Sequence, residues 1–144
     1  MTMTITSDAL IRQWFEQVWN QGNEAAIDTL MSADALVHGL PTPDGKPIRG
    51  SGGFKPFFRA FHSAFPDIRV VVERTVTEGD LVVAHCHTVG THKGDSLGFP
   101  STGNKVDFWG VCIARVKDGQ LVEGWNCFDF LTCYAQLGVI SMPN

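Results

Sequence analysis

The chain has 144 residues, of which 44% are hydrophobic and only 18% charged, with a formal net charge of −4. This composition excludes an intrinsically disordered chain and a strongly basic nucleic-acid-binding surface, and it suits one domain with one core. The N-terminus lacks the regions of a secretion signal and no apolar run reaches the roughly 18 residues of a membrane span, so we expect a cytoplasmic protein without nucleic-acid or membrane partners.

Two helices are predicted at the start of the chain. Thr6 or Ser7 can cap the first, whose apolar residues recur at helical spacing: Leu10, Ile11, Trp14, Phe15, Val18 and Trp19. Gly22 breaks this helix, and Asn23 is expected to cap a short second helix that buries Ala26, Ile27, Leu30 and Met31. The pair should form a helical hairpin.

A loop and an aromatic helix are expected next. Residues 36–38 read as extended chain, and the prolines and glycines of residues 39–53 predict an irregular loop that could form a pocket rim. A third helix should follow, with Pro56 in its first turn and Pro66 enforcing its end. One face of this helix carries Phe54, Phe57, Phe58, Phe61 and Phe65, a stripe that more often forms core than a ligand site.

The second half of the chain has the period of β-strands. Two strands are predicted about the turn at residues 78–80, two more about residues 118–119, and a short helix over residues 131–138. We therefore expect an α+β fold in a single domain over residues 1–144. A curved antiparallel or mixed sheet would pack on the N-terminal helices as a cone-shaped barrel with an internal pocket.

Asp129 is the candidate catalytic residue. Strand parity places Trp125, Cys127 and Asp129 on one face, so a carboxylate would lie among large apolar side chains. Desolvation there would raise its pKa above the reference value of ~3.9 and favour general acid/base chemistry. The alternative is that Asp129 caps the following helix, where aspartate is favoured.

Three histidines lie within eight residues of each other. His85 and His87 share a strand face, and His92 follows shortly after. They could orient a substrate carbonyl, they could be buried and paired polar groups, or they could bind a metal together with His38 or Asp129. The four cysteines form no C-x-x-C pair, so we expect buried free thiols.

Several strings, in order, resemble the SnoaL-like polyketide cyclases of the nuclear transport factor 2-like superfamily. They include FPDIRVVVE at residues 65–73, EGDLVVAH at 78–85, GTHKG at 90–94, ARVKDGQLVEGW at 114–125 and the W-x-x-x-D spacing that ends at Asp129. The resemblance implies an α+β cone, commonly dimeric, that requires no cofactor. It also implies that Asp129 is the general acid/base of an intramolecular aldol closure, and that His38 and His92 orient the substrate.

The leading hypothesis is thus an enzyme that uses no cofactor and no metal, in which ionised Asp129 removes a proton from a hydrophobic carbonyl substrate. The candidate substrate-binding residues are His38, His85, His87, His92, Trp109, Trp125 and Asn126. The expected partners are a hydrophobic small molecule and a second copy of the chain. Alternatives are a non-catalytic binding protein for a lipophilic metabolite, and a dehydratase, isomerase or epoxide hydrolase on the same fold.

Overall fold

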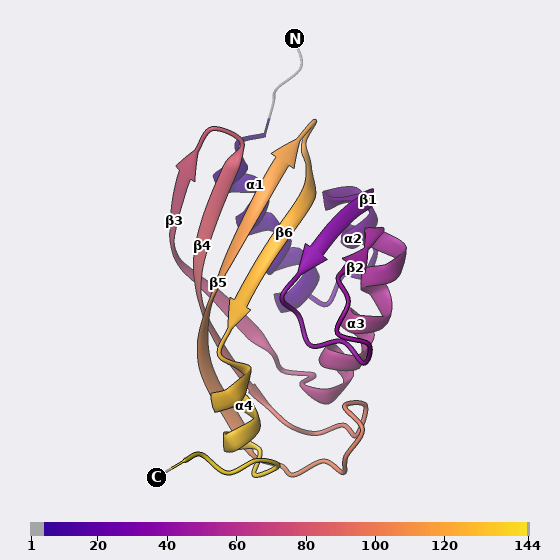
Figure 1. Cartoon of the computed structure of the whole chain (residues 1–144), viewed down its shortest axis with the longest axis vertical. Helices are drawn as coiled ribbons and strands as arrows, with labels where there is room; N and C mark the ends of the chain where they lie inside the picture. The colour runs from indigo at the N-terminus through magenta and orange to yellow at the C-terminus, as the bar shows by residue number, and fades with distance from the viewer. Residues whose placement is uncertain (1–4, 144) are drawn as a thin grey trace.

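The computed structural model describes residues 5–143 and shows an α+β fold with a six-stranded sheet. Its elements are α1 (Ser7–Gln13), the π-helix η1 (Trp14–Asn20), α2 (Ala25–Leu30), β1 (Met31–His38), β2 (Ile48–Arg49), α3 (Gly50–Ala64), β3 (Arg69–Glu78), β4 (Leu81–Thr91), β5 (Lys105–Lys117), β6 (Gln120–Phe128) and α4 (Phe130–Gln136). The strand order is β2-β1-β6-β5-β4-β3, as Figure 1 shows. Neighbouring strands are antiparallel except β1 and β6, which are parallel. The predicted fold class and both predicted hairpins are confirmed.

The two faces of the sheet differ in their cover. The helices α1 to α3 pack on one face (Figure 1), and there Val82, Ala84 and Cys86 of β4 are fully buried. On the opposite face Val71 and Trp109 remain exposed. One face of the sheet therefore builds the core while the other is open. None of the helices in the described part of the chain is long and apolar enough to cross a membrane.

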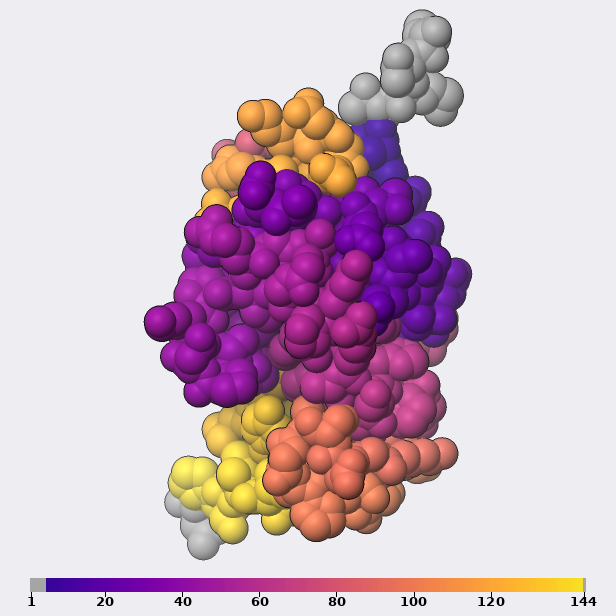
Figure 2. Space-filling view, turned by 90° about the vertical axis from the view of Figure 1, so that its right-hand side faces the viewer, coloured from indigo at the N-terminus to yellow at the C-terminus, as the bar shows by residue number. Residues whose placement is uncertain are grey.

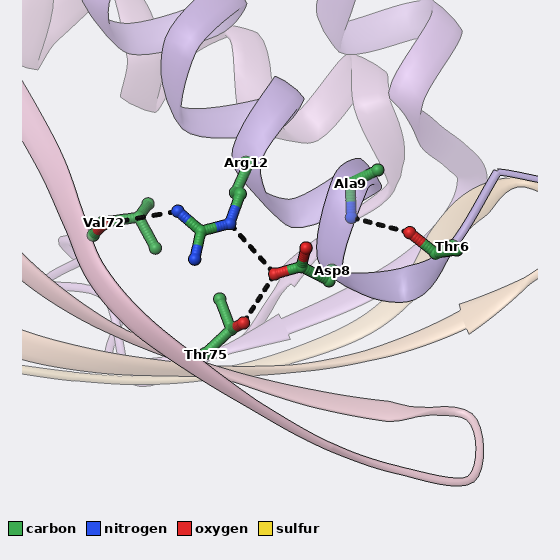
Figure 3. Close-up of polar contacts among 6 residues, drawn as sticks. All are labelled: Thr6, Asp8, Ala9, Arg12, Val72 and Thr75. Carbon is green, nitrogen blue, oxygen red and sulfur yellow. Dashed lines mark hydrogen bonds and ion pairs between the residues drawn. The ribbon is translucent and has the colours of Figure 1, made fainter.

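Polar contacts attach α1 to the sheet (Figure 3). Thr6 caps the helix by accepting a hydrogen bond from the Ala9 N–H at 3.1 Å. The Asp8 carboxylate accepts hydrogen bonds from the Thr75 hydroxyl at 2.5 Å and from Arg12 Nε at 2.9 Å. The Thr75 hydrogen bond, followed by that of Arg12, lowers the pKa of Asp8. These contacts set where α1 begins and how it lies on β3.

The first helix does not continue as one α-helix, which corrects the prediction from its spacing. From Trp14 to Asn20 the chain forms a π-helix. In a π-helix each backbone hydrogen bond joins residues five positions apart, so residues i and i+5 lie closer to the same side than they do in an α-helix. Trp14 and Trp19 accordingly both pack against Phe54 of α3, with ring centroids 5.1 and 6.1 Å apart. We attribute the wider turn to this packing, which backbone periodicity alone does not reveal.

The second helix is shorter than predicted and lacks the expected cap. Its N-cap is Glu24, without a side-chain capping bond, and Asn23 contributes its backbone carbonyl to Ala26 N–H at 3.1 Å. Glu24 instead pairs with Arg59 of α3 at 2.6 Å. Met31 is buried as predicted, but it begins β1.

The segment 39–53 is less irregular than predicted. Ile48 pairs with Val37 as part of the short strand β2, and α3 begins at Gly50, so Pro56 lies inside the helix and not in its first turn. Gly50 has a φ of +74°, and a Cβ there would lie 2.1 Å from the Ala33 carbonyl oxygen. The close approach to β1 requires glycine at this helix start.

Candidate functional site

An apolar cavity lies between the covered face of the sheet and the helices. It encloses about 90 Å³ and, together with its open mouth, about 790 Å³. Its aromatic wall comprises Trp14, Trp19, Phe54, Phe57, Phe61 and Phe108. Figure 2 shows the side on which α3 and the segment 39–49 close over the sheet. The cavity is of the concave, mostly apolar kind that holds small molecules.

Two uncharged polar side chains border this cavity. Thr88 of β4 is only 3% exposed, and within residues 5–143 its hydroxyl has no hydrogen-bond partner. Asn126 of β6 donates one amide hydrogen to the His38 carbonyl oxygen at 3.1 Å. Cys112 also lines the cavity, and burial raises the pKa of its thiol to about 12, so it remains a neutral, apolar group.

Asp129 does not face the cavity, which corrects the prediction of a desolvated carboxylate. The register pairs Gly110 with Phe128 and Cys112 with Asn126, so Asn126 and Phe128 face inward, whereas Trp125 and Cys127 face the open side. Asp129 lies just beyond the end of β6 and is exposed.

The capping interpretation of Asp129 is confirmed. Its carboxylate accepts hydrogen bonds from the Thr132 hydroxyl at 2.6 Å and the Thr132 backbone N–H at 3.0 Å at the start of α4. These bonds, the hydroxyl's first, lower the pKa of Asp129, opposite to the predicted direction. The capping hydrogen bonds stabilise the ionised form here and outweigh the opposing effect of burial.

His38 forms a hydrogen-bond contact with Glu123 that the sequence did not indicate. Its Nε2 lies 2.8 Å from Glu123 Oε2, and both side chains are about 30% exposed. The imidazole also stacks on Trp125, with ring centroids 5.7 Å apart and planes inclined by 16°. Glu123 was missed because Leu36 and Glu123 meet through the parallel pairing of β1 with β6, across more than 80 residues of chain.

A second hollow adjoins the cavity. His38 and Lys46 border it together with glycine and proline residues of the segment 39–47, and it shares Leu40 and Phe130 with the cavity. His38 borders this hollow at the end of β1, but its imidazole stacks on Trp125 and so lies on the open side of the sheet.

The other predicted histidines and tryptophans lie elsewhere. His85 and His87 are on the open sheet face. There the Trp109 ring stacks on His87, with ring centroids 4.5 Å apart, and its centroid lies 4.9 Å from that of His85. His87 Nε2 lies 2.5 Å from Asp107 Oδ1. None of these side chains borders the cavity, because odd-numbered positions of β4 and β5 point away from the helices.

His92 is fully buried and belongs to the packing of the loop 93–104. Its Nδ1 accepts a hydrogen bond from the Thr102 N–H at 3.1 Å, and its ring lies against Phe65 and Phe99. The three histidines of this region thus do not converge. Among residues 5–143, no group of three histidine, cysteine or acidic side chains is arranged to hold a metal ion.

One cysteine departs from the predicted burial. Cys86, Cys112 and Cys133 are buried free thiols, whereas Cys127 is free and exposed on the open face. Its position on the outward side of β6 explains the difference.

Comparison with known proteins gives one consistent family. The family model described as SnoaL-like polyketide cyclase matches residues 9–137. IdmH of Streptomyces antibioticus, a proposed polyketide cyclase, is 33% identical over 92% of this chain and 98% of its own, with a TM-score of 0.77. TsrD of Streptomyces laurentii is 25% identical over 92% of this chain and 95% of its own, with a TM-score of 0.79.

A more distant structure shares the fold. A SnoaL-like protein of Jannaschia sp. CCS1 is 22% identical over 99% of this chain and 100% of its own, with a TM-score of 0.80. No curated protein is significantly similar to the chain.

Proposed function

Because this chain belongs to the SnoaL-like polyketide cyclase family, we propose that it closes a ring in an apolar, carbonyl-bearing substrate of the polyketide class. The observation that carries this proposal is the apolar cavity, into which Thr88 and Asn126 bring hydrogen-bonding groups. The similarity to IdmH, a proposed polyketide cyclase, supports the same class of reaction.

The cavity would act first by folding the substrate. Aromatic walls hold an extended apolar chain in a bent conformation, which brings its reacting carbons together and lowers the entropic part of the barrier. The cavity also excludes water from the reacting carbons.

Two donors would then act on a substrate carbonyl. Asn126 Nδ2 carries two hydrogens and uses one on the His38 carbonyl, so one remains for a ligand. The unpartnered Thr88 hydroxyl can donate as well, and a desolvated donor stabilises developing negative charge more strongly than one in water.

The test is to fill the cavity and measure binding of benzoylacetone, an apolar 1,3-diketone. Ala114→Leu adds volume to a residue that lines the cavity, so we expect binding about tenfold weaker or worse by calorimetry. Val83→Leu on the open sheet face is the matched control and should bind as the wild type does. Equal affinity in all three proteins would refute the cavity as the binding site.

A second candidate function is binding without turnover. It is favoured by the scarcity of ionisable groups at the cavity: Glu123 borders it, but its carboxylate is engaged by His38. Recovery of chemically unaltered ligand after prolonged incubation with polyketide substrates that the protein binds would support this function over cyclisation.

We also propose that a second copy of the chain covers the open sheet face. Trp109 is 43% exposed there, beside Val71 and the histidine pair, and an exposed aromatic patch of this kind marks interaction surfaces. Sedimentation analysis should show a dimer for the wild type and a monomer for Trp109→Lys. A monomeric wild type at micromolar concentration would contradict the proposal.

A further inference from the structure

We propose that Phe130, the first residue of α4, determines how long a substrate the apolar cavity accepts. The inference rests on the proposed function, since it concerns the same ligand in the same cavity. It assigns a specificity-determining residue to that site, with Leu40 as the second side chain at the same boundary.

The cavity is closed at one end and open at the other. Its closed end lies between η1 and the sheet, where the lining side chains of Trp14 and Leu121 are buried. At the other end the lining side chains are only half-buried, namely Leu40, Phe57 and Phe130. The mouth of the cavity therefore lies at these three side chains, and Phe130 is one of its walls.

The second hollow begins at this mouth. It has a volume of about 380 Å³ and lies against the segment 39–47. Leu40 and Phe130 line both the hollow and the cavity, and no other described residue lines both. A ligand that extends from the cavity toward the hollow must therefore pass these two side chains.

The ring of Phe130 is held in place by its neighbours. Its centroid lies 5.8, 6.0 and 6.2 Å from those of Phe61, Phe108 and Phe128, all of which line the cavity. Its backbone is fixed by the preceding residue, because Asp129 caps α4 with its carboxylate and donates its N–H to a β5 carbonyl at 2.9 Å. The boundary between cavity and hollow is thus a packed part of the fold.

The volume of the cavity brings a substrate into contact with this boundary. The enclosed part, about 90 Å³, is smaller than the roughly 300 to 1,000 Å³ of most small-molecule sites. A ligand of the polyketide class therefore fills the closed end with one part of its apolar body, and the remainder reaches the mouth. There it meets Phe130.

The length of the ligand decides what this contact does to affinity. Each methylene group that is buried in the cavity should tighten binding about fourfold. Once the chain has reached Phe130, further methylene groups remain in water and add little. Without the Phe130 ring the cavity would join the hollow, and the same methylene groups would be buried there.

The test measures, by calorimetry with the full-length protein, the affinity for benzoylacetone and for homologues with longer alkyl chains, up to 1-phenyl-1,3-decanedione. For the wild type, affinity should rise with chain length and then level off. For Phe130→Ala it should continue to rise, so that the longest homologue binds about tenfold more tightly than to the wild type, or better. The control is Leu131→Ala, because Leu131 is the next residue of α4 but is exposed and lines neither hollow. Its affinities should level off at the same chain length as those of the wild type.

Phe130→Trp tests the same role in the opposite direction and decides the matter if Phe130→Ala does not fold. The larger ring should make affinity level off at a shorter chain length. An unchanged limit in the folded Phe130 variants, or a wild-type affinity that rises through the whole series, would overturn the role of Phe130. If benzoylacetone still binds to the wild type, the proposed function survives that result, whereas failure of every homologue to bind refutes both.

Discussion

Asp129, at the end of β6, and Thr88, on β4, are polar side chains that differ in exposure to solvent. Asp129 is a carboxylate in solvent that accepts two hydrogen bonds from Thr132, and Thr88 is a buried hydroxyl without a partner in the described part of the chain. The Asp129 carboxylate is stabilised by these two hydrogen bonds. The Thr88 hydroxyl has lost its hydration and gains no hydrogen bond in exchange, which costs free energy. A site for a ligand is therefore to be sought at Thr88 and not at Asp129.

Replacing Thr88 with valine should stabilise the ligand-free protein and weaken ligand binding. Valine has the same shape but no unsatisfied hydroxyl, so we expect roughly 1 to 3 kcal/mol of added stability, measured by urea unfolding. Benzoylacetone should bind less tightly because a donor is lost. A less stable Thr88→Val protein would show that the hydroxyl has a partner in solution.

Replacing Asp129 with alanine should destabilise α4 and leave the chemistry intact. We expect the melting temperature to fall by a few degrees, whereas Asp129→Asn, which can still cap, should change it little. The pKa of Asp129 is lower in the folded state than in the unfolded state. Its contribution to stability is therefore fully present at pH values above the unfolded-state pKa, and it is lost as the pH falls through the folded-state pKa. Melting curves of wild type and alanine variant should therefore converge in acid. Loss of substrate turnover in Asp129→Asn, with benzoylacetone binding unchanged, would restore Asp129 as a catalytic candidate.

At the scale of elements, side-chain contacts between segments decide local structure that periodicity predicts only in part. Trp14 and Trp19 meet Phe54, and η1 adopts the π-helical turn that allows it. Ile48 finds Val37, and a short strand forms within a segment that reads as loop. In each case the partner lies on another element.

The attachment of α1 to β3 gives a prediction at this scale. Asp8→Ala removes an acceptor shared by Thr75 and Arg12, and we expect a loss of roughly 0.2 to 1 kcal/mol, since the carboxylate is largely exposed. The pKa of Asp8 is lowered in the folded state. The stabilisation is therefore present at pH values above the unfolded-state pKa and disappears as the pH falls through the folded-state pKa. Hydrogen exchange should accelerate in α1 at neutral pH and not in α4. Uniform acceleration would contradict a local role.

At the scale of the whole molecule, the two faces of the sheet have different chemistry. The covered face carries the cavity and buried thiols, and burial raises the pKa values of Cys86, Cys112 and Cys133 to about 12. The open face carries Cys127, which is exposed in the single chain. The open face also carries two histidines stacked on tryptophans, His38 on Trp125 and His87 on Trp109.

Thiol labelling should report this division. A disulfide reagent should modify Cys127 in the native protein, and the other three cysteines should react only after unfolding, because a buried neutral thiol is a poor nucleophile. In the proposed dimer Cys127 would be partly covered, so Trp109→Lys should increase its labelling rate. Rapid labelling of all four cysteines in the native state would contradict the packed core.

The sequence by itself determined the fold class, the two hairpins, the aromatic helix and the family. These depend on apolar spacing, on turn residues such as Asp118 and Gly119, and on ordered strings of residues, all of which are local in the chain. The sequence analysis also named Asn126 as a candidate substrate-binding residue, and Asn126 lines the cavity.

Only the tertiary structure decided which side chains meet at the cavity. Strand parity correctly grouped Trp125 with Cys127, but whether that face is covered or open depends on where the helices pack. Likewise, His38 and Glu123 meet only because β1 lies parallel to β6. Contacts of this kind join residues far apart in the chain, so their chemistry follows from packing and not from spacing.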